Sequence, residues 1–231
     1  MDELLKALDY FGVVVFAISG GLTAARKGMD LVGFALIGTV TGIGGGTLRD
    51  LLLDKPVYWL TEWEYVLMTV LAAWAVFFFA RMPPFLGRPP SGSPGGDPRF
   101  APDESVAFTP RLQVMLNWAD AVGLAVFSLI GAQAALASGT SPFIAVVMGM
   151  MTASFGGLIR DMLCNEPPMI LHREVYASAA AAGATVFVVL HELAAPALLT
   201  LTAGFLAALV VRGLGIVYGL HLPAFPKSDH S

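Results

Sequence analysis

The chain repeats itself once, without a gap, at an offset of 111 residues. Identical residues recur at this spacing along both copies, among them Asp9 and Asp120, Gly12 and Gly123, Phe16 and Phe127, Arg49 and Arg160, Asp50 and Asp161, and Tyr65 and Tyr176. Each copy holds three apolar stretches, and an odd number of membrane crossings turns the second copy upside down in a bilayer. Inverted repeats of this kind are typical of proteins that move solutes across membranes.

The composition indicates a chain that lies in a bilayer. Of its 231 residues, 56% are hydrophobic and only 13% are charged, whereas a typical soluble domain carries roughly 25% charged residues. The charges also leave long gaps, with none between Asp9 and Arg26 or between Asp120 and Arg160. A transmembrane helix needs about 20 mostly apolar residues. We therefore predict an all-α polytopic membrane protein and not a soluble domain.

Apolar stretches and turn signals predict seven transmembrane helices, near residues 8–26, 30–53, 64–81, 118–137, 142–163, 174–192 and 196–219. The first three form one repeat, the next three form the inverted second repeat, and the seventh helix is additional. Between the repeats lies a segment rich in proline and glycine, which predicts a flexible cytoplasmic linker. The predicted division is a first repeat, a linker, a second repeat, a seventh helix and a tail, at residues 1–82, 83–111, 112–193, 194–221 and 222–231.

Lysine and arginine are distributed unequally between the two ends of these helices. One side carries Arg26, Lys27, Arg81, Arg88, Arg99, Arg111, Arg160, Arg173 and Lys227, and the other carries only Lys6, Arg49 and Lys55. Positive residues are retained preferentially in the cytoplasm. We therefore predict that the N-terminus lies outside and the C-terminus in the cytoplasm.

Glycines gather in the second predicted helix of each repeat. The sequence from Gly42 to Asp50 reads GIGGGTLRD, and its counterpart from Ala153 to Asp161 reads ASFGGLIRD. One interpretation is packing, because small residues let membrane helices approach closely. The other adds a kink whose freed carbonyls face a cation, and the repetition of the run favours it. The residues concerned are Gly44, Gly45, Gly46, Gly156 and Gly157, with Phe155 at the position that matches Gly44.

An Arg-Asp pair follows each glycine run, at Arg49-Asp50 and Arg160-Asp161. A charge within the hydrocarbon core costs at least about 2.5 kcal/mol, so it normally faces a partner or a wet cavity. The pairs are therefore either structural salt bridges near the interface or residues that line and gate the two entrances of a solute path. Because a free arginine repels cations, a cation path requires each arginine to be paired or turned aside.

Other polar residues also allow two interpretations each. The hydroxyls of Thr41 and Thr152 either coordinate a passing ion or bond to the preceding turn of their own helix. Asp9 and Asp120 fall in the first turns of the predicted first and fourth helices, where the helix dipole favours them. Arg212 is expected to reach the lipid headgroups near the cytoplasmic end of the seventh helix, with a contact to anionic lipid as the alternative.

The sequence argues against an enzyme. The single cysteine, Cys164, excludes an intramolecular disulfide and a cysteine-based metal cluster, and the four histidines lack ligand spacing. Neither Ser154 nor Cys164 has a histidine at helical spacing. We therefore expect no catalytic residues, no metal, no cofactor and no nucleic-acid partner.

The chain resembles the prokaryotic trimeric intracellular cation (TRIC) channel family. The resemblance rests on two copies of a three-helix unit, each with a Gly-Gly-x-x-Arg-Asp signature in its second helix, followed by a seventh helix. Related bacterial proteins are described as glycine transporters. The resemblance covers about residues 5–220 except the linker. It implies a homotrimer in the inner membrane of a prokaryote. It also implies kinks at the glycines named above, and a path for monovalent cations, mainly potassium, between the second and fifth helices of each protomer. The pairs at 49–50 and 160–161 then flank this path. Phe155 departs from the pattern, and either plugs the path or fills a gap against lipid.

The predicted function is thus a potassium-conducting channel, with membrane lipids, including anionic phospholipid, beside its basic cytoplasmic side. A secondary transporter of a small solute such as glycine is the alternative, because broken helices also suit a closed binding site at the midplane. A structural or lipid-binding protein without transport is the third possibility.

Overall fold

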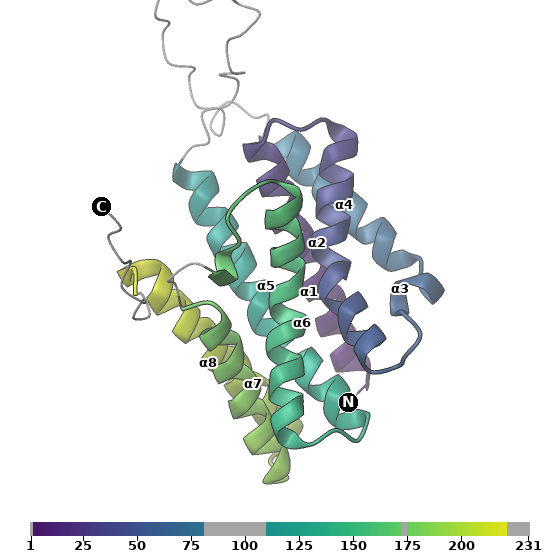
Figure 1. Ribbon diagram of the computed structural model, residues 1–231, viewed down its shortest axis with the longest axis vertical. Helices are drawn as coiled ribbons and strands as arrows, with labels where there is room; N and C mark the ends of the chain where they lie inside the picture. The colour runs from purple at the N-terminus through teal and green to yellow at the C-terminus, as the bar shows by residue number, and fades with distance from the viewer. Residues whose placement is uncertain (1, 81–109, 172–174, 221–231) are drawn as a thin grey trace, which may run out of the picture.

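The computed structural model describes residues 2–80, 110–171 and 175–220, and every regular element within these residues is helical (Figure 1). The helices are α1 (Asp2–Arg26), α2 (Leu31–Leu52), α3 (Tyr58–Thr61), α4 (Glu64–Ala80), α5 (Pro110–Ala137), α6 (Pro142–Leu163), the 3-10 turn η1 (Met169–Leu171), α7 (Ala177–Glu192) and α8 (Ala197–Tyr218). The short elements α3 and η1 begin 111 residues apart, at Tyr58 and Met169. The repeat therefore extends to the turns after α2 and α6.

The seven long helices form two bundles that pack against each other. Helices α1, α2 and α4 contact one another in the first repeat, and α5, α6 and α7 do so in the second. The repeats meet where α1 packs on α5 and α2 packs on α6, while α8 covers α7 and α5. In the view of Figure 1, α1 runs upward from the N-terminus and α5 runs downward, so the two copies have opposite directions. This arrangement confirms the predicted fold class of two inverted three-helix repeats plus a seventh helix.

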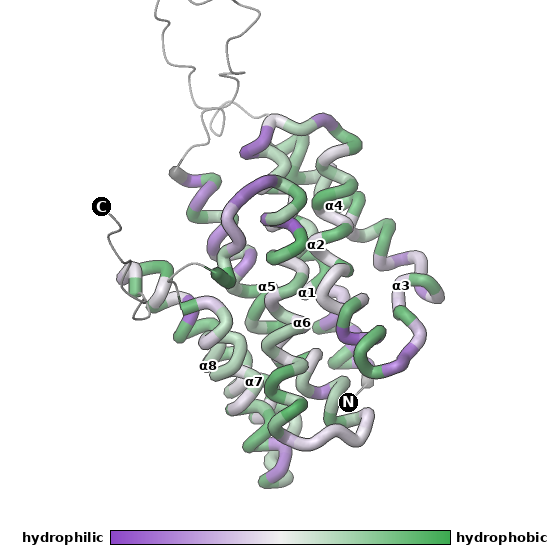
Figure 2. The backbone as a smooth tube through the Cα atoms, viewed as in Figure 1, coloured by the Kyte–Doolittle hydropathy of each residue, from purple (hydrophilic) through white to green (hydrophobic). Residues whose placement is uncertain are grey.

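Most predicted helix ends agree with the structure to within a few residues. Helices α1, α2, α5, α6 and α8 are long and apolar enough to cross a membrane. Helices α4 and α7 are also apolar but shorter, with 17 and 16 residues. Apolar residues gather along the middle of the bundle and hydrophilic residues mostly towards its ends (Figure 2).

Two helix starts were predicted wrongly. Helix α1 begins at Asp2 instead of residue 8, and α5 begins at Pro110 instead of residue 118. Hydropathy marks where a chain enters lipid, whereas a helix continues through polar residues whose backbone bonds are made within the helix. The predicted linker 83–111 therefore ends earlier, since 110 and 111 belong to α5, and its residues 83–109 lie outside the described residues, as do 222–231 of the predicted tail.

The residues that begin and end the helices are duplicated as well. The Asp30 carboxylate accepts the Gly33 N–H before α2 (2.8 Å), and the Ser141 hydroxyl accepts the Ile144 N–H before α6 (3.4 Å). Asp30 and Ser141 are 111 residues apart, and both are favourable N-cap residues. After α1 and α5 the chain turns through left-handed backbone at Gly28 and Gly139, where φ is 63° and 77°. Both repeats therefore fold by the same local rules.

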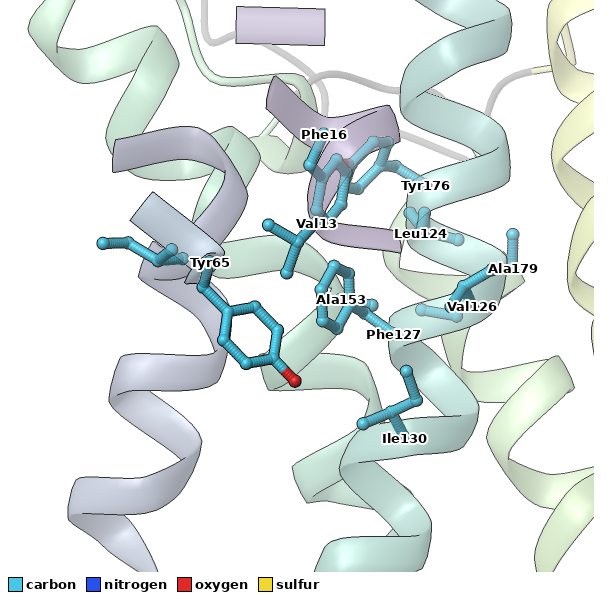
Figure 3. Packing of buried hydrophobic residues seen from close by; sticks show 12 residues of the cluster. Val13, Phe16, Tyr65, Leu124, Val126, Phe127, Ile130, Ala153, Tyr176 and Ala179 are labelled. Atoms are coloured by element: carbon cyan, nitrogen blue, oxygen red, sulfur yellow. The ribbon is translucent and has the colours of Figure 1, made fainter. Parts of the chain in front are cut away.

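The interface between the repeats is the centre of the core. Its apolar cluster draws Val13 and Phe16 from α1 and Leu124 and Phe127 from α5 (Figure 3). The rings of Phe16 and Phe127 stack with centroids 5.2 Å apart and planes 8° apart. Because these two residues are partners at the 111-residue offset, the stack lies on the pseudo-symmetry axis between the repeats.

Candidate functional site

The glycine runs lie where α2 crosses α6. A Cβ atom on Gly45 would lie closer than 3.0 Å to the Thr152 carbonyl oxygen, and one on Gly156 would lie closer than 3.0 Å to the Thr41 carbonyl oxygen. The two helices therefore touch backbone to backbone, which only glycine permits at these positions. Both helices are assigned as helical without interruption through the glycines. Close packing is thus directly visible, while the additional kink stays a prediction.

The remaining members of the run have different neighbours. A Cβ on Gly44 would meet only the flexible end of Ile159 at 3.1 Å and the Gly156 Cα at 3.7 Å. One on Gly46 would lie 2.7 Å from the Tyr58 ring, and one on Gly157 would lie 2.9 Å from the Tyr176 hydroxyl. These last two glycines leave room for aromatic side chains. Phe155 is half-buried on α6, and its role as a plug stays a prediction.

The threonines at the crossing bond to their own helices. The Thr41 hydroxyl donates to the Ile37 carbonyl at 2.6 Å, and the Thr152 hydroxyl donates to the Met148 carbonyl at 2.7 Å. Of the two interpretations of these residues, the structure contains the local hydrogen bond. It is their backbone carbonyls that face the glycines of the opposite repeat.

Each Arg-Asp pair ties the end of its helix to the segment that follows. Nε of Arg49 donates to Asp50 at 2.7 Å, and Nε of Arg160 donates to Asp161 at 2.8 Å. The second carboxylate oxygen of Asp50 accepts the Tyr58 N–H (3.1 Å). That of Asp161 accepts the Met169 N–H (2.9 Å). Charged groups make stronger hydrogen bonds than neutral ones, so both pairs have a structural role in addition to any role in transport.

The arginine of the pair in the second repeat is fully enclosed. Arg160 has no exposed surface, and its guanidinium lies 2.8 Å from Asp120 and bonds to the Ser19 hydroxyl of α1. It therefore joins α6 to α5 and to the first repeat. The expectation that the helix dipole explains Asp120 was wrong, because α5 begins at Pro110 and places Asp120 in the middle of the helix. Its partner is the buried arginine.

The pair in the first repeat is more open. The Asp9 carboxylate accepts the Tyr65 hydroxyl at 2.9 Å, and its other oxygen, which is buried, has no hydrogen-bond partner among the described residues. Arg49 lies over the Tyr58 ring, 5.5 Å from its centroid. Asp9 also lies well inside its helix, since α1 begins at Asp2, so the dipole explanation was wrong for Asp9 too. The repeats thus share the same residues but differ in how tightly these are paired.

A polar cavity opens at each end of the bundle. The cavity in the first repeat has a volume of about 430 Å³ and is lined by Asp9, Arg49, Asp50, Tyr58, Glu62 and Tyr65, together with α5 residues such as Gln133. The cavity at the other end measures about 160 Å³ and is lined by Arg26, Gln113, Asn117, Asp161, Glu166 and Met169, with Pro167. Along α1, Asp9 and Arg26 are 17 residues apart, which is about 25 Å at the helical rise. We call the larger cavity the wide mouth and the smaller cavity the narrow mouth.

Ion pairs hold the narrow mouth together. Glu166, in the segment after α6, lies 3.0 Å from Arg26 and 2.6 Å from Lys27, and Arg26 also donates to Gln113 of α5 at 3.1 Å. At the wide mouth, Lys6 of α1 lies 2.8 Å from Glu62. These contacts therefore connect α1, α5 and the segment after α6 across the narrow mouth.

Arg212 is not placed as expected. Its side chain is only 1% exposed and lies over the Tyr176 ring, 5.0 Å from the centroid. The prediction that it reaches the lipid headgroups was wrong, because the aromatic face offers the guanidinium a partner inside the bundle. Within the described residues, no group of three or more His, Cys, Asp or Glu side chains is placed to hold a metal ion.

The sequence analysis missed some residues of the two mouths and of the buried surroundings of Arg160. Tyr65 and Tyr176 are identical at the repeat offset and contact the two charged clusters, so their pairing was a usable signal. Ser19 gave no such signal, because its counterpart in the second repeat is Ile130. Glu166 also gave none, because its counterpart is Lys55.

Comparison with known proteins agrees with this architecture. A family model described as "Glycine transporter" matches the chain twice, over residues 6–81 and 117–192, which are the two repeats. The UPF0126 inner membrane protein YadS of Escherichia coli (strain K12) is 36% identical over 98% of this chain and 99% of its own length. A UPF0126 membrane protein of Vibrio cholerae is 35% identical over 96% of this chain and 83% of its own length.

Solved structures share the fold over nearly the whole chain. The TRIC trimeric intracellular cation channel orthologue of Rhodobacter sphaeroides has 44% identity and a TM-score of 0.80, covering 94% of this chain and 99% of its own. A prokaryotic TRIC channel in 0.5 M KCl has 30% identity and a TM-score of 0.80, covering 96% of this chain and 100% of its own. The chain therefore belongs to this family of two-repeat membrane proteins, whose family model is described as a glycine transporter and whose solved members are TRIC cation channels.

Proposed function

We propose that the protein is a channel for monovalent cations, chiefly potassium, with one path in each protomer between the two repeats. The observation that carries the proposal is the pair of mouths at opposite ends of the bundle, each lined by the aspartate of one repeat's Arg-Asp motif, Asp50 at the wide mouth and Asp161 at the narrow mouth. The titles of the similar solved structures, which describe cation channels, support it.

Each mouth offers a cation carboxylates as well as basic side chains, with Lys6, Arg49 and Lys55 at the wide mouth and Arg26 at the narrow mouth. Arg49 and Arg160, which would repel a cation, are each bonded to the neighbouring aspartate. Carboxylates line both cavities: Asp9 at the wide mouth has no ion pair among the described residues, while Glu62 is paired with Lys6, and Glu166 at the narrow mouth is paired with Arg26 and Lys27. Carboxylate and hydroxyl oxygens replace part of the hydration shell of a hard cation, so these positions lower the cost of entering the protein.

We further propose that the protein is a homotrimer in the inner membrane, with the wide mouth outside. The distribution of lysine and arginine supports this orientation, since Arg26 and Lys27 lie at the narrow mouth. The name of the Escherichia coli relative supports the inner membrane, and the titles of the solved TRIC structures support the trimer. Anionic phospholipid beside the basic cytoplasmic side stays part of the proposal.

The test is potassium flux through purified protein in liposomes, measured with a potassium-sensitive dye. Asp9→Asn is expected to lower the flux, because the variant removes the negative charge of a carboxylate that lines the wide mouth. The matched control is Glu192→Gln, whose carboxylate is exposed at the end of α7 and lines neither mouth. Equal fluxes for wild type and Asp9→Asn would count against the wide mouth as the entrance, and no flux in wild type would refute the channel.

A secondary transporter of glycine is the second candidate. The family description favours it, and so does one feature of the wide mouth: Asp9 and Arg49 line the same cavity without an ion pair between them among the described interactions. A zwitterion presents an amine and a carboxylate to such a pair. Saturable glycine uptake without unitary currents would favour the transporter over the channel.

A further inference from the structure

We propose that Glu166 closes the narrow mouth through its ion pairs with Arg26 and Lys27, and that the path opens on this side when these pairs break. The proposal rests on the path described under Proposed function. Oε2 of Glu166 lies 3.0 Å from Nη2 of Arg26, and its Oε1 lies 2.6 Å from Nζ of Lys27. One carboxylate of the second repeat therefore binds two cationic side chains at the end of α1 in the first repeat. We call these three residues the latch.

The carboxylate of the latch lies on a turn that is bonded to α6. The Glu166 N–H donates to the Asp161 carbonyl at 2.8 Å. The Asp161 carboxylate accepts the Met169 N–H at 2.9 Å. A shift of α6 therefore carries Glu166 with it. Because Glu166 and Asp161 line the narrow mouth together with Arg26, separation of this turn from α1 widens the cavity.

The same turn occurs at the wide mouth with the opposite charge. Lys55 is the counterpart of Glu166 at the repeat offset. Its N–H donates to the Asp50 carbonyl at 2.9 Å, so the backbone of the two turns is bonded alike. Its Nζ donates one long hydrogen bond, of 3.4 Å, to the exposed Ala134 carbonyl of α5. The turn is thus joined to the opposite repeat by two ion pairs at the narrow mouth and by a single hydrogen bond at the wide mouth, where the cavity is larger.

The latch can break while the bundle stays intact. Its side chains are 24%, 26% and 31% exposed, and pairs with such exposure contribute little to stability and are screened by salt. Arg26 also donates to Gln113 of α5 at 3.1 Å, so α1 and α5 stay connected when Glu166 is released. The ion pair between Lys6 and Glu62 at the wide mouth lies within the first repeat, so it does not hold the two repeats together.

The first test is current recording from the purified protein in a planar bilayer. Glu166→Gln removes both ion pairs at nearly constant size. It is expected to raise the ratio of open to closed time about two- to thirtyfold, which corresponds to the loss of two partly exposed pairs. Lys27→Gln removes only one pair and is expected to raise the ratio less. The matched control is Glu192→Gln, whose carboxylate is exposed and lines neither mouth, and its ratio is expected to equal that of wild type.

Charge reversal and salt test whether the ion pairs themselves produce the effect. A variant that combines Glu166→Lys with Arg26→Glu and Lys27→Glu restores both pairs with opposite signs, and it is expected to restore the wild-type ratio. Raising the KCl concentration on the narrow-mouth side from about 0.1 M to about 1 M shortens the screening length from about 10 Å to about 3 Å. This change is expected to raise the ratio in wild type more than in Glu166→Gln. A reversed variant as open as Glu166→Gln, or an equal effect of salt in both proteins, would overturn the latch.

Labelling tests the latch without relying on ion currents. In a background where Cys164→Ala removes the single native cysteine, Asn117→Cys places a reporter in the narrow mouth. An uncharged, membrane-impermeant thiol reagent is added on that side, and it is expected to react faster when Glu166→Gln is also present. Equal labelling rates in folded protein would overturn the latch. Faster labelling in a protein that carries no current would instead refute the channel and leave the latch in place.

Discussion

The close crossing of α2 and α6 makes a quantitative prediction at Gly45. A methyl group there meets the Thr152 carbonyl oxygen at less than 3.0 Å and the carbonyl carbon at 3.2 Å, whereas ordinary contacts begin at 3.4 Å. These are backbone atoms of a helix, so they cannot rotate away, and the helices must separate. Gly45→Ala is therefore expected to destabilise the protein.

The magnitude follows from two opposing terms. Forcing an extra carbon into a packed interface costs about 1–3 kcal/mol, while alanine gains about 1 kcal/mol of helix propensity over glycine. Because both contacting groups are rigid, the overpacking cost lies in the upper part of its range, at about 2–3 kcal/mol, which leaves a net loss of about 1–2 kcal/mol. For a chain of this size that is a fall in Tm of about 2–8 °C.

The matched control is the neighbouring glycine. A Cβ on Gly44 meets only the Cδ1 atom of Ile159 within 3.4 Å, and that flexible side chain can move. Gly44→Ala is therefore expected to leave Tm unchanged or raise it slightly. Both variants are heated in detergent, and the folded fraction is measured by size-exclusion chromatography with fluorescence detection. Equal losses at both positions would refute the close-crossing argument and favour a kink that needs both glycines.

Three further predictions concern the charged and polar residues. Arg160→Gln is expected to destabilise the protein by about 3–5 kcal/mol, because it leaves the buried Asp120 carboxylate unpaired. Arg49→Gln is expected to destabilise it by less, because Arg49 borders a cavity. Equal losses of Tm in the two variants would contradict this expectation. Thr41→Val is expected to leave the single-channel conductance unchanged, because its hydroxyl bonds to Ile37; a lower conductance would place that hydroxyl in the path. The hydrogen bond from Lys6 lowers the pKa of Glu62 below its usual 4.5, so the folded state binds this proton less readily than the unfolded state does. The pair therefore stabilises the protein at neutral pH and loses this effect as the pH falls through the lowered pKa, and Tm measured from pH 7 to pH 3 should fall less in Glu62→Gln than in wild type.

The fold was largely predictable because the same three-helix pattern occurs twice in the sequence. The 111-residue offset and the apolar stretches predicted seven helices. The N-cap residues Asp30 and Ser141 lie at the same offset and begin corresponding helices in the structure. The starts of α1 and α5 were not predictable from hydropathy, because polar residues such as Lys6 and Gln113 extend both helices beyond their apolar part.

The candidate site was predictable only in part. Repetition identified the glycines and the Arg-Asp pairs, yet it did not indicate that Arg160 forms an ion pair with Asp120 while Arg49 forms none with the matching Asp9 among the described interactions. That difference depends on neighbours that the repeats do not share, such as Ser19 opposite Ile130. The burial of Arg212 over Tyr176 likewise depends on how α8 packs, which no local pattern encodes.

The central claim is conduction of cations, and the most direct measurement is the reversal potential of the purified protein in a planar bilayer under a potassium chloride gradient. The account predicts discrete unitary currents that reverse near the potassium equilibrium potential, because carboxylates line both mouths and the arginine of each Arg-Asp motif is bonded to its aspartate. Currents that reverse near the chloride potential, or no current from protein that takes up glycine saturably, would contradict it.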